Sequence, residues 1–253
     1  MSTSPPSAGA ARIDIADEIG RAYRAVIDNV RLVVEMAVIP LLIVLAAELV
    51  ALFLRGGGIA GQALGALVEM VGFLVFGAVY VVRWHRYVLL GDRVSGGFIP
   101  PGWAPFFVAG LKVGGLVVLG WVVLVVIAVV PPHLVTMPLT VAGGIALTLA
   151  AMRVSLIFPA AAIERPVGLS TAWDWIVGNF WRLFVCLVVC YLPFVVVEVI
   201  VNAIAGVFPA LLWIVFEALR LAVSFAGIAV VAALLSHLYR EIVGDPSPSA
   251  AAA

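Results

Sequence analysis

The sequence predicts an all-α polytopic membrane protein: six transmembrane helices in three hairpins, with amphipathic surface helices on the cytoplasmic side. The first observation behind this prediction is the composition. Of 253 residues, 65% are hydrophobic and only 11% are charged, and the mean hydropathy is +1.24. A soluble domain has about a quarter charged residues, so a water-soluble fold, a disordered chain and a coiled coil are excluded. Lys plus Arg and Asp plus Glu both number 14, which leaves no net charge for binding nucleic acid.

The second observation is a set of six apolar stretches, each long enough to cross a bilayer, which takes about 20 residues. The stretches are continuous rather than alternating, and this favours helices over the strands of a membrane barrel. We expect residues 12–245 to form a single six-helix domain between two disordered tails, 1–11 and 246–253. The predicted spans are 32–54, 59–82, 106–130, 134–158, 183–207 and 218–238.

The third observation is the distribution of basic residues, of which all but Arg55 and Arg220 fall on one side of the spans. Basic residues accumulate in cytoplasmic loops, so we expect both termini in the cytoplasm. The large excess of arginine over lysine indicates a GC-rich bacterial genome. Tryptophans flank the spans on the same side, as interface anchors do; they are Trp84, Trp103, Trp173, Trp175 and Trp181.

Two segments on this side predict surface helices. In residues 14–31, Ile15, Ile19 and Val26 lie on one helical stripe and charged residues such as Glu18 lie on the rest. This pattern is typical of a helix lying in the membrane surface. Residues 170–181 predict a second such helix, and the Gly- and Pro-rich stretch 96–105 predicts a loop.

Two pairs of segments about 150 residues apart resemble each other. Residues 22–29 resemble 172–179, and residues 88–92 resemble 241–245. A repeated unit of surface helix plus hairpin, used about three times, explains both pairs. Chance similarity within an apolar chain is the alternative.

Ionisable side chains inside the spans cost at least a few kcal/mol in hydrocarbon, so each needs a partner or a role. Glu69 shares a helical stripe with Gly61 and Gly65, and we expect this stripe to face a neighbouring helix. Near the cytoplasmic face Glu35 could pair with Arg153, or Arg153 could extend alone to the interface. The candidate intramembrane polar site comprises Glu48, Glu69, Glu198, Asn202, Glu217 and Arg220.

By depth, all of these except Glu69 could meet in the outer leaflet. One arginine cannot neutralise three carboxylates, so one interpretation is a proton- or cation-sensitive site. Another is interhelical hydrogen bonding plus a Glu217–Arg220 pair. A third is that the spans end earlier and these groups lie among the lipid headgroups.

Motifs of known enzymes are absent from the sequence: no GxSxG, HExxH, P-loop or dinucleotide fingerprint occurs. The three histidines are not spaced as metal ligands, and Cys186 and Cys190 have the character of small packing residues. We therefore expect no catalytic residues, no metal and no cofactor.

A motif between the fourth and fifth spans suggests a family. Its residues are Arg153, Pro159, Glu164, Trp173, Asn179, Trp181 and Arg182. This stretch resembles the bacterial six-helix membrane families related to YciC and to the membrane domain attached to some glycerophosphodiester phosphodiesterases. The phosphodiesterase domain is missing here, so its activity is not implied. The resemblance implies an inner-membrane protein linked to the envelope or lipids, in which Pro159 bends the fourth span and Trp173 anchors the surface helix.

These observations predict a non-enzymatic integral inner-membrane protein that binds lipids or partner membrane proteins in envelope organisation. The expected partners are the lipid bilayer and other membrane proteins, with no nucleic acid. The alternative is a small-solute or proton-coupled transporter that uses the intramembrane carboxylates. The oligomeric state does not follow from the sequence.

Overall fold

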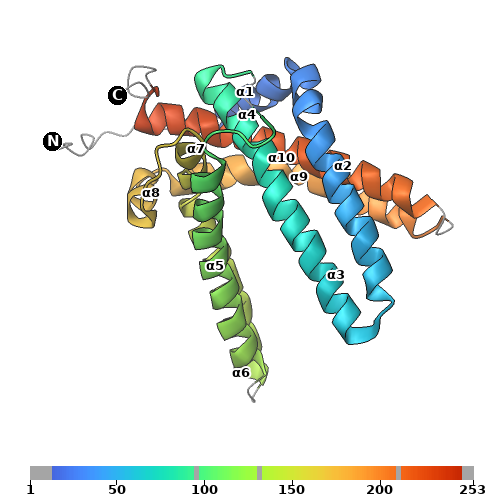
Figure 1. The fold of residues 1–253 in the computed structure, drawn as a ribbon. Helices are drawn as coiled ribbons and strands as arrows, with labels where there is room; N and C mark the ends of the chain where they lie inside the picture. Colours follow the sequence, from blue (N-terminus) through green and yellow to red (C-terminus); the bar gives the residue numbers. More distant parts are fainter. Residues whose placement is uncertain (1–12, 94–96, 130–132, 209–211, 247–253) are drawn as a thin grey trace.

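The computed structural model describes residues 13–93, 97–129, 133–208 and 212–246, which form helices and no strand. Six helices are long and apolar enough to cross a membrane, which confirms the predicted class. They pair into three hairpins, drawn in Figure 1. The spans are α2 (Val30–Arg55), α3 to α4 (Gly58–Leu90), α5 (Trp103–Ala128), α6 (His133–Arg153), α9 (Phe180–Ala205) and α10 (Trp213–Val243). The predicted tails lie outside the described residues except for Pro246.

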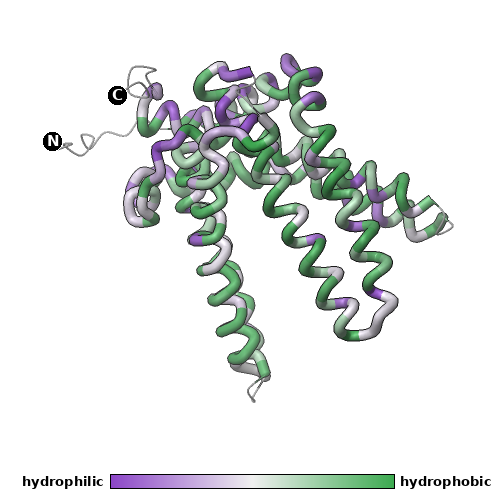
Figure 2. The backbone as a smooth tube through the Cα atoms, viewed as in Figure 1, coloured by the Kyte–Doolittle hydropathy of each residue, from purple (hydrophilic) through white to green (hydrophobic). Residues whose placement is uncertain are grey.

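The three hairpins diverge from a common hub (Figure 1). We use "hub" for the three short helices together with the C-terminal ends of α4 and α10; the short helices are α1 (Ile15–Ile27), α7 (Ile157–Ala162) and α8 (Leu169–Trp175). Figure 2 shows the hydrophilic segments gathered in the hub and the hairpins mostly hydrophobic. The second span has 33 residues, about 50 Å of helix. This length exceeds the thickness of the hydrocarbon core, which is about 30 Å.

The second span continues as one rod through a π-helical turn, η1 (Phe73–Gly77), into α4 (Ala78–Leu90). A π turn displaces backbone carbonyls from their α-helical partners. The Val75 carbonyl accepts a hydrogen bond of 3.3 Å from the Trp103 indole, which ties the start of α5 to this turn.

The core of the hub forms where α4 and α10 lie side by side. The Tyr80 hydroxyl donates to the Phe225 carbonyl at 3.2 Å, and the Trp84 indole donates to the Ala229 carbonyl at 2.8 Å. Trp84 is fully buried, so the prediction that it anchors the interface is wrong. The reason is that the span extends to Leu90 instead of ending at 82, which places Trp84 inside the helix–helix contact.

Helix α1 packs on α9 and α10. Asp14 caps the helix by accepting hydrogen bonds from the Ala16 and Asp17 amides. The helix ends at Ile27, whereas the sequence predicted that it continues to residue 31. Glu18, expected on its polar face, is only 1% exposed. That expectation is wrong because α10 reaches beyond the predicted end at 238 and covers this side of α1.

The connection between the fourth and fifth spans differs from the prediction in two ways. Helix α6 ends at Arg153 rather than 158, and α7 begins at Ile157. Pro159 therefore lies in the first turn of α7, where a missing amide hydrogen is tolerated, and the bend precedes it. The second surface helix is short: α8 ends at Trp175, and Gly178 turns the chain with a φ of 84°.

The loop before α5 depends on one glycine. Gly102 has a φ of 81°, and a Cβ placed there would lie 2.2 Å from the Ala162 carbonyl oxygen. Only glycine allows both this backbone conformation and this close approach. The contact joins the loop to α7 and so fixes the hub end of the α5–α6 hairpin.

Both pairs of similar segments share local features in the structure. Asn29 precedes α2 with φ and ψ of −122° and 25°, and Asn179 precedes α9 with −115° and 3°. Helices α4 and α10 both end at a glycine of positive φ, Gly91 and Gly244. An arginine of each helix pairs with the aspartate that follows its glycine, Arg86 with Asp92 at 3.2 Å and Arg240 with Asp245 at 2.7 Å.

Candidate functional site

A cluster of charged side chains joins α2 and α10 within the spans. The Arg220 guanidinium donates to Glu217, one turn earlier on α10, with Nε 2.7 Å from the carboxylate. It also donates to the Glu48 carboxylate of α2 at 3.0 Å. The side chains of Glu48 and Glu217 are 14% and 12% exposed. We call these three residues the Arg220 cluster.

The Arg220 cluster contains one cation for two carboxyl groups. With both carboxylates ionised the cluster has a net charge of −1, and with one of them protonated it is neutral. An unbalanced charge in a membrane span is costly.

Glu198 and Asn202 were predicted at the same depth, but the structure does not bring them into the cluster. Glu198 forms no ion pair with Arg220 at salt-bridge distance, and its Oε1 is buried without a hydrogen-bond partner among the described residues. Asn202 is exposed near the C-terminal end of α9. The depth of a side chain in the membrane follows from its position along the helix. Which helix the side chain faces depends on how the helices are arranged around it.

Glu69 lies in a separate pair inside the α2–α3 hairpin. Its carboxylate accepts hydrogen bonds of 2.5 and 2.6 Å from Arg55. The glycine stripe of α3 lies against α2: a Cβ on Gly65 would stand 2.9 Å from the Ala51 carbonyl oxygen and 3.3 Å from the Arg55 side chain. Gly65 thus leaves room for the arginine stem, and Glu69 contacts protein as expected.

The suggested pairing of Glu35 with Arg153 is wrong. Glu35 pairs with Arg31, one turn earlier on α2, at 2.8 Å. Arg153 instead lies over the Trp173 ring, 4.1 Å from its centre. The α5–α6 hairpin is placed away from the start of α2 (Figure 1), so the two side chains never meet.

Two motif residues hold the segment that enters α1. The Asn179 side-chain oxygen accepts a hydrogen bond of 3.4 Å from the Ile13 amide, and Arg182 donates one of 2.5 Å to the Ile13 carbonyl. Ile13 is fully buried. Trp181, in contrast, is 65% exposed, so it does not contribute to this clamp.

The remaining motif residue, Glu164, follows α7 with a φ of 61°. The amides of Glu164 and Arg165 donate to the carbonyls of Ala161 and Ala160, which is the pattern of a Schellman cap. Glycine is the usual residue at this position. The glutamate side chain points toward Arg86, with an N–O distance of 3.8 Å.

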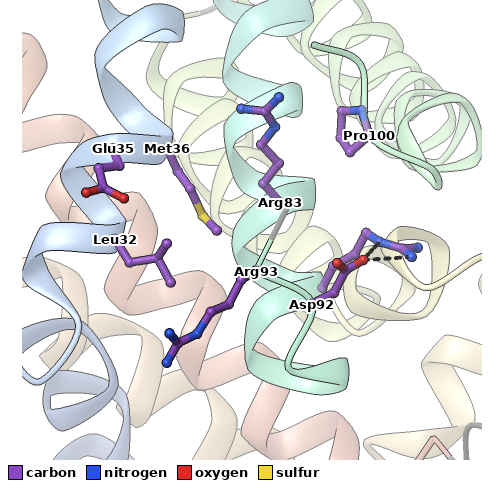
Figure 3. Close-up of a pocket in the computed structure, with 8 residues that line it drawn as sticks. Leu32, Glu35, Met36, Arg83, Asp92, Arg93 and Pro100 are labelled. Atoms are coloured by element: carbon purple, nitrogen blue, oxygen red, sulfur yellow. Dashed lines mark hydrogen bonds and ion pairs between the residues drawn. The ribbon is translucent and has the colours of Figure 1, made fainter. Parts of the chain in front are cut away.

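A small basin lies between the start of α2 and the end of α4 (Figure 3). Arg83 donates to the carbonyls of Gly97 and Phe98, and Arg86 pairs with Asp92. In Figure 3 the guanidinium groups of Arg83 and Arg93 point away from each other. The arginine side chains of this basin therefore do not point toward a common position where one ligand could bind them.

Two buried polar contacts in the hub escaped the sequence reasoning. His85, 1% exposed, lies with Nδ1 2.7 Å from the Ser236 hydroxyl. Glu18 lies against Arg21 at 3.0 Å, while burial and the charge of the nearby Glu241 raise its pKa to about 7.

Within the described ranges, no group of three or more His, Cys, Asp or Glu side chains could hold a metal ion. Cys186 and Cys190 are free thiols buried in the core. Comparison of the chain with protein-family models, curated proteins and solved structures gave no match. The family resemblance of the motif stays an expectation from the sequence.

Proposed function

We propose that this is a non-enzymatic integral protein of a bacterial inner membrane that binds lipids or partner membrane proteins in envelope organisation. One observation supports the proposal above others: the α5–α6 hairpin leaves most of its length unpacked. Val118, Leu119 and Val126 are 63%, 61% and 59% exposed. In a bilayer these apolar faces contact acyl chains or another membrane protein.

The arrangement of charge supports an orientation with the hub in the cytoplasm. Arg21, Arg83, Arg86 and Arg240 all lie in or near the hub, while Arg55 lies at the opposite end of α2. A labelling experiment tests this topology. In a chain without Cys186 and Cys190, a cysteine at Ile59 should react with an impermeant thiol reagent from outside, and one at Ile99 only after permeabilisation; both positions are exposed.

Native mass spectrometry of the protein, purified in mild detergent, tests the binding proposal. We expect specific lipids or a partner protein to remain bound after delipidation by extended washing. Loss of every lipid without preference, together with the absence of any partner in affinity purification, would overturn it.

The second candidate is proton-coupled transport, which the Arg220 cluster favours because it holds two carboxyl groups and one arginine. Glu48→Gln should then abolish proton-driven flux in proteoliposomes while the protein still folds. Glu35→Gln is the matched control, because Glu35 is in an exposed pair outside the cluster. A cysteine at Glu198 that an impermeant reagent labels would show the water access that transport needs.

A further inference from the structure

An apolar furrow runs along the α5–α6 hairpin from the hub toward the hairpin tip. Its hub end is a groove of about 380 Å³ between α5, α6 and α8. Leu116 and Leu147 line this groove and also the shallower groove that continues along the hairpin. From Val113 to Leu124 the furrow follows α5 for about 16 Å, and its walls there are apolar or glycine. Its width and chemistry suit an acyl chain.

Two charged side chains without ion-pair partners stand at the hub end of this furrow. The Arg153 guanidinium lies over Trp173, a lining residue of the groove, and its Nε is buried without a hydrogen-bond partner. Asp174 also lines the groove. Among the described residues neither side chain forms an ion pair, with the other or with any third group.

We propose that this furrow binds one zwitterionic glycerophospholipid of the phosphatidylethanolamine class. The Arg153 guanidinium would bind the phosphate, the Asp174 carboxylate would accept hydrogen bonds from the ammonium, and an acyl chain would fill the furrow. This inference rests on the proposed function, lipid binding, and specifies the class of lipid that is bound.

Charge complementarity selects this headgroup. Guanidinium groups bind phosphate through paired N–H donors, which accounts for Arg153. The anionic lipid phosphatidylglycerol has an uncharged glycerol in place of the ammonium. This glycerol would lie against Asp174 and leave the charge of the carboxylate unbalanced. Phosphatidylcholine has the right charges, but its quaternary ammonium has no N–H to donate to the carboxylate.

Photocrosslinking tests the proposal in the full-length protein. The probe is phosphatidylethanolamine with a photoreactive acyl chain, in phosphatidylcholine liposomes, and mass spectrometry of peptides locates the crosslinks. We expect them on α5 and α6 along the furrow. Unlabelled phosphatidylethanolamine should compete better than phosphatidylglycerol, and inorganic phosphate should not compete.

Two pairs of variants separate the headgroup contacts from general effects. Arg153→Ala should lower crosslinking in the furrow about tenfold, the loss expected for a hydrogen bond to a charged group. Lys112→Ala is its control, because Lys112 is an exposed cation of α5 that lies outside the groove lining and has no ion pair in the described part of the chain. Asp174→Asn should remove the preference for phosphatidylethanolamine over phosphatidylglycerol, which a purely structural role would leave unchanged.

The acyl chain has its own matched pair on α6. Ala146 lines the furrow, and Ala142, one turn away, is also exposed but does not line it. Ala146→Leu should abolish the furrow crosslinks and Ala142→Leu should preserve them. Crosslinks spread evenly over all three hairpins would overturn this site while leaving lipid binding intact. An absence of any retained lipid or partner would overturn the proposed function itself.

Discussion

The Arg182 guanidinium, in the first turn of α9, donates a hydrogen bond of 2.5 Å to the backbone carbonyl of Ile13, 169 residues earlier in the chain. Asn179 accepts from the amide of the same residue. Together they bind both backbone polar groups of one buried residue, Ile13, so the start of α1 is fixed to the start of α9. The motif therefore has an architectural role in this chain.

Removing this clamp should destabilise the hub. We expect Arg182→Ala to lower the free energy of unfolding by about 1–3 kcal/mol, because the Ile13 carbonyl is left buried and unsatisfied. Thermal unfolding followed by tryptophan fluorescence measures the effect. Trp181→Phe is the neighbouring control and should change little, since Trp181 is largely exposed. Equal stability of the Arg182 variant and the wild type would contradict the clamp.

We predict that the protein is less stable with glutamate at position 164 than it would be with glycine there. A positive φ costs a non-glycine residue about 1 kcal/mol, whereas its pair with Arg86 is long and the carboxylate is 58% exposed, so the pair contributes less. Glu164→Gly should therefore raise the unfolding midpoint by a few degrees. Glu164→Ala keeps the strained backbone and loses the pair, so a midpoint above that of the glycine variant would refute this account.

Stability should depend on pH through Glu18. Burial and the neighbouring Glu241 raise its pKa from 4.5 to about 7, against the opposing effect of Arg21. The folded state thus binds this proton more tightly than the unfolded state. The free energy of unfolding should fall as pH rises from about 4.5 to about 7, and then level off.

The comparison with Glu18→Gln isolates this contribution from other titrating groups. Between these pH values the free energy of unfolding of the wild type should fall by up to about 3 kcal/mol more than that of the variant. Chemical unfolding at a series of pH values measures it. Parallel pH profiles for variant and wild type would show that Glu18 titrates normally.

The α2–α3 contact should not tolerate a methyl group at Gly61. A Cβ there would lie 2.1 Å from the Leu54 carbonyl oxygen, which belongs to the backbone and cannot move aside. We expect Gly61→Ala to cost about 1–3 kcal/mol. Gly115→Ala is the matched control, because nothing lies within 4 Å of a Cβ at that position of α5, and alanine favours helix. If both variants were equally stable, the helices would be further apart than described.

The fold class and the number of spans followed from the sequence alone, because crossing a bilayer requires a minimum length of apolar helix and such stretches are evident in a sequence. The same logic placed five polar side chains at one depth, of which Glu48, Glu217 and Arg220 meet and Glu198 and Asn202 do not join them. Depth is a one-dimensional property, and a sequence encodes it directly.

Partners within the bundle were decided by tertiary structure. Glu69 binds Arg55, Glu35 binds Arg31, and Trp84 is buried, because these outcomes depend on which helices are neighbours and how each is rotated. In a chain so uniformly apolar, every face of a helix has nearly the same composition, so periodicity marks no preferred face. Close backbone approaches at glycines and a few buried hydrogen bonds, such as that of Arg182 with Ile13, select the arrangement instead.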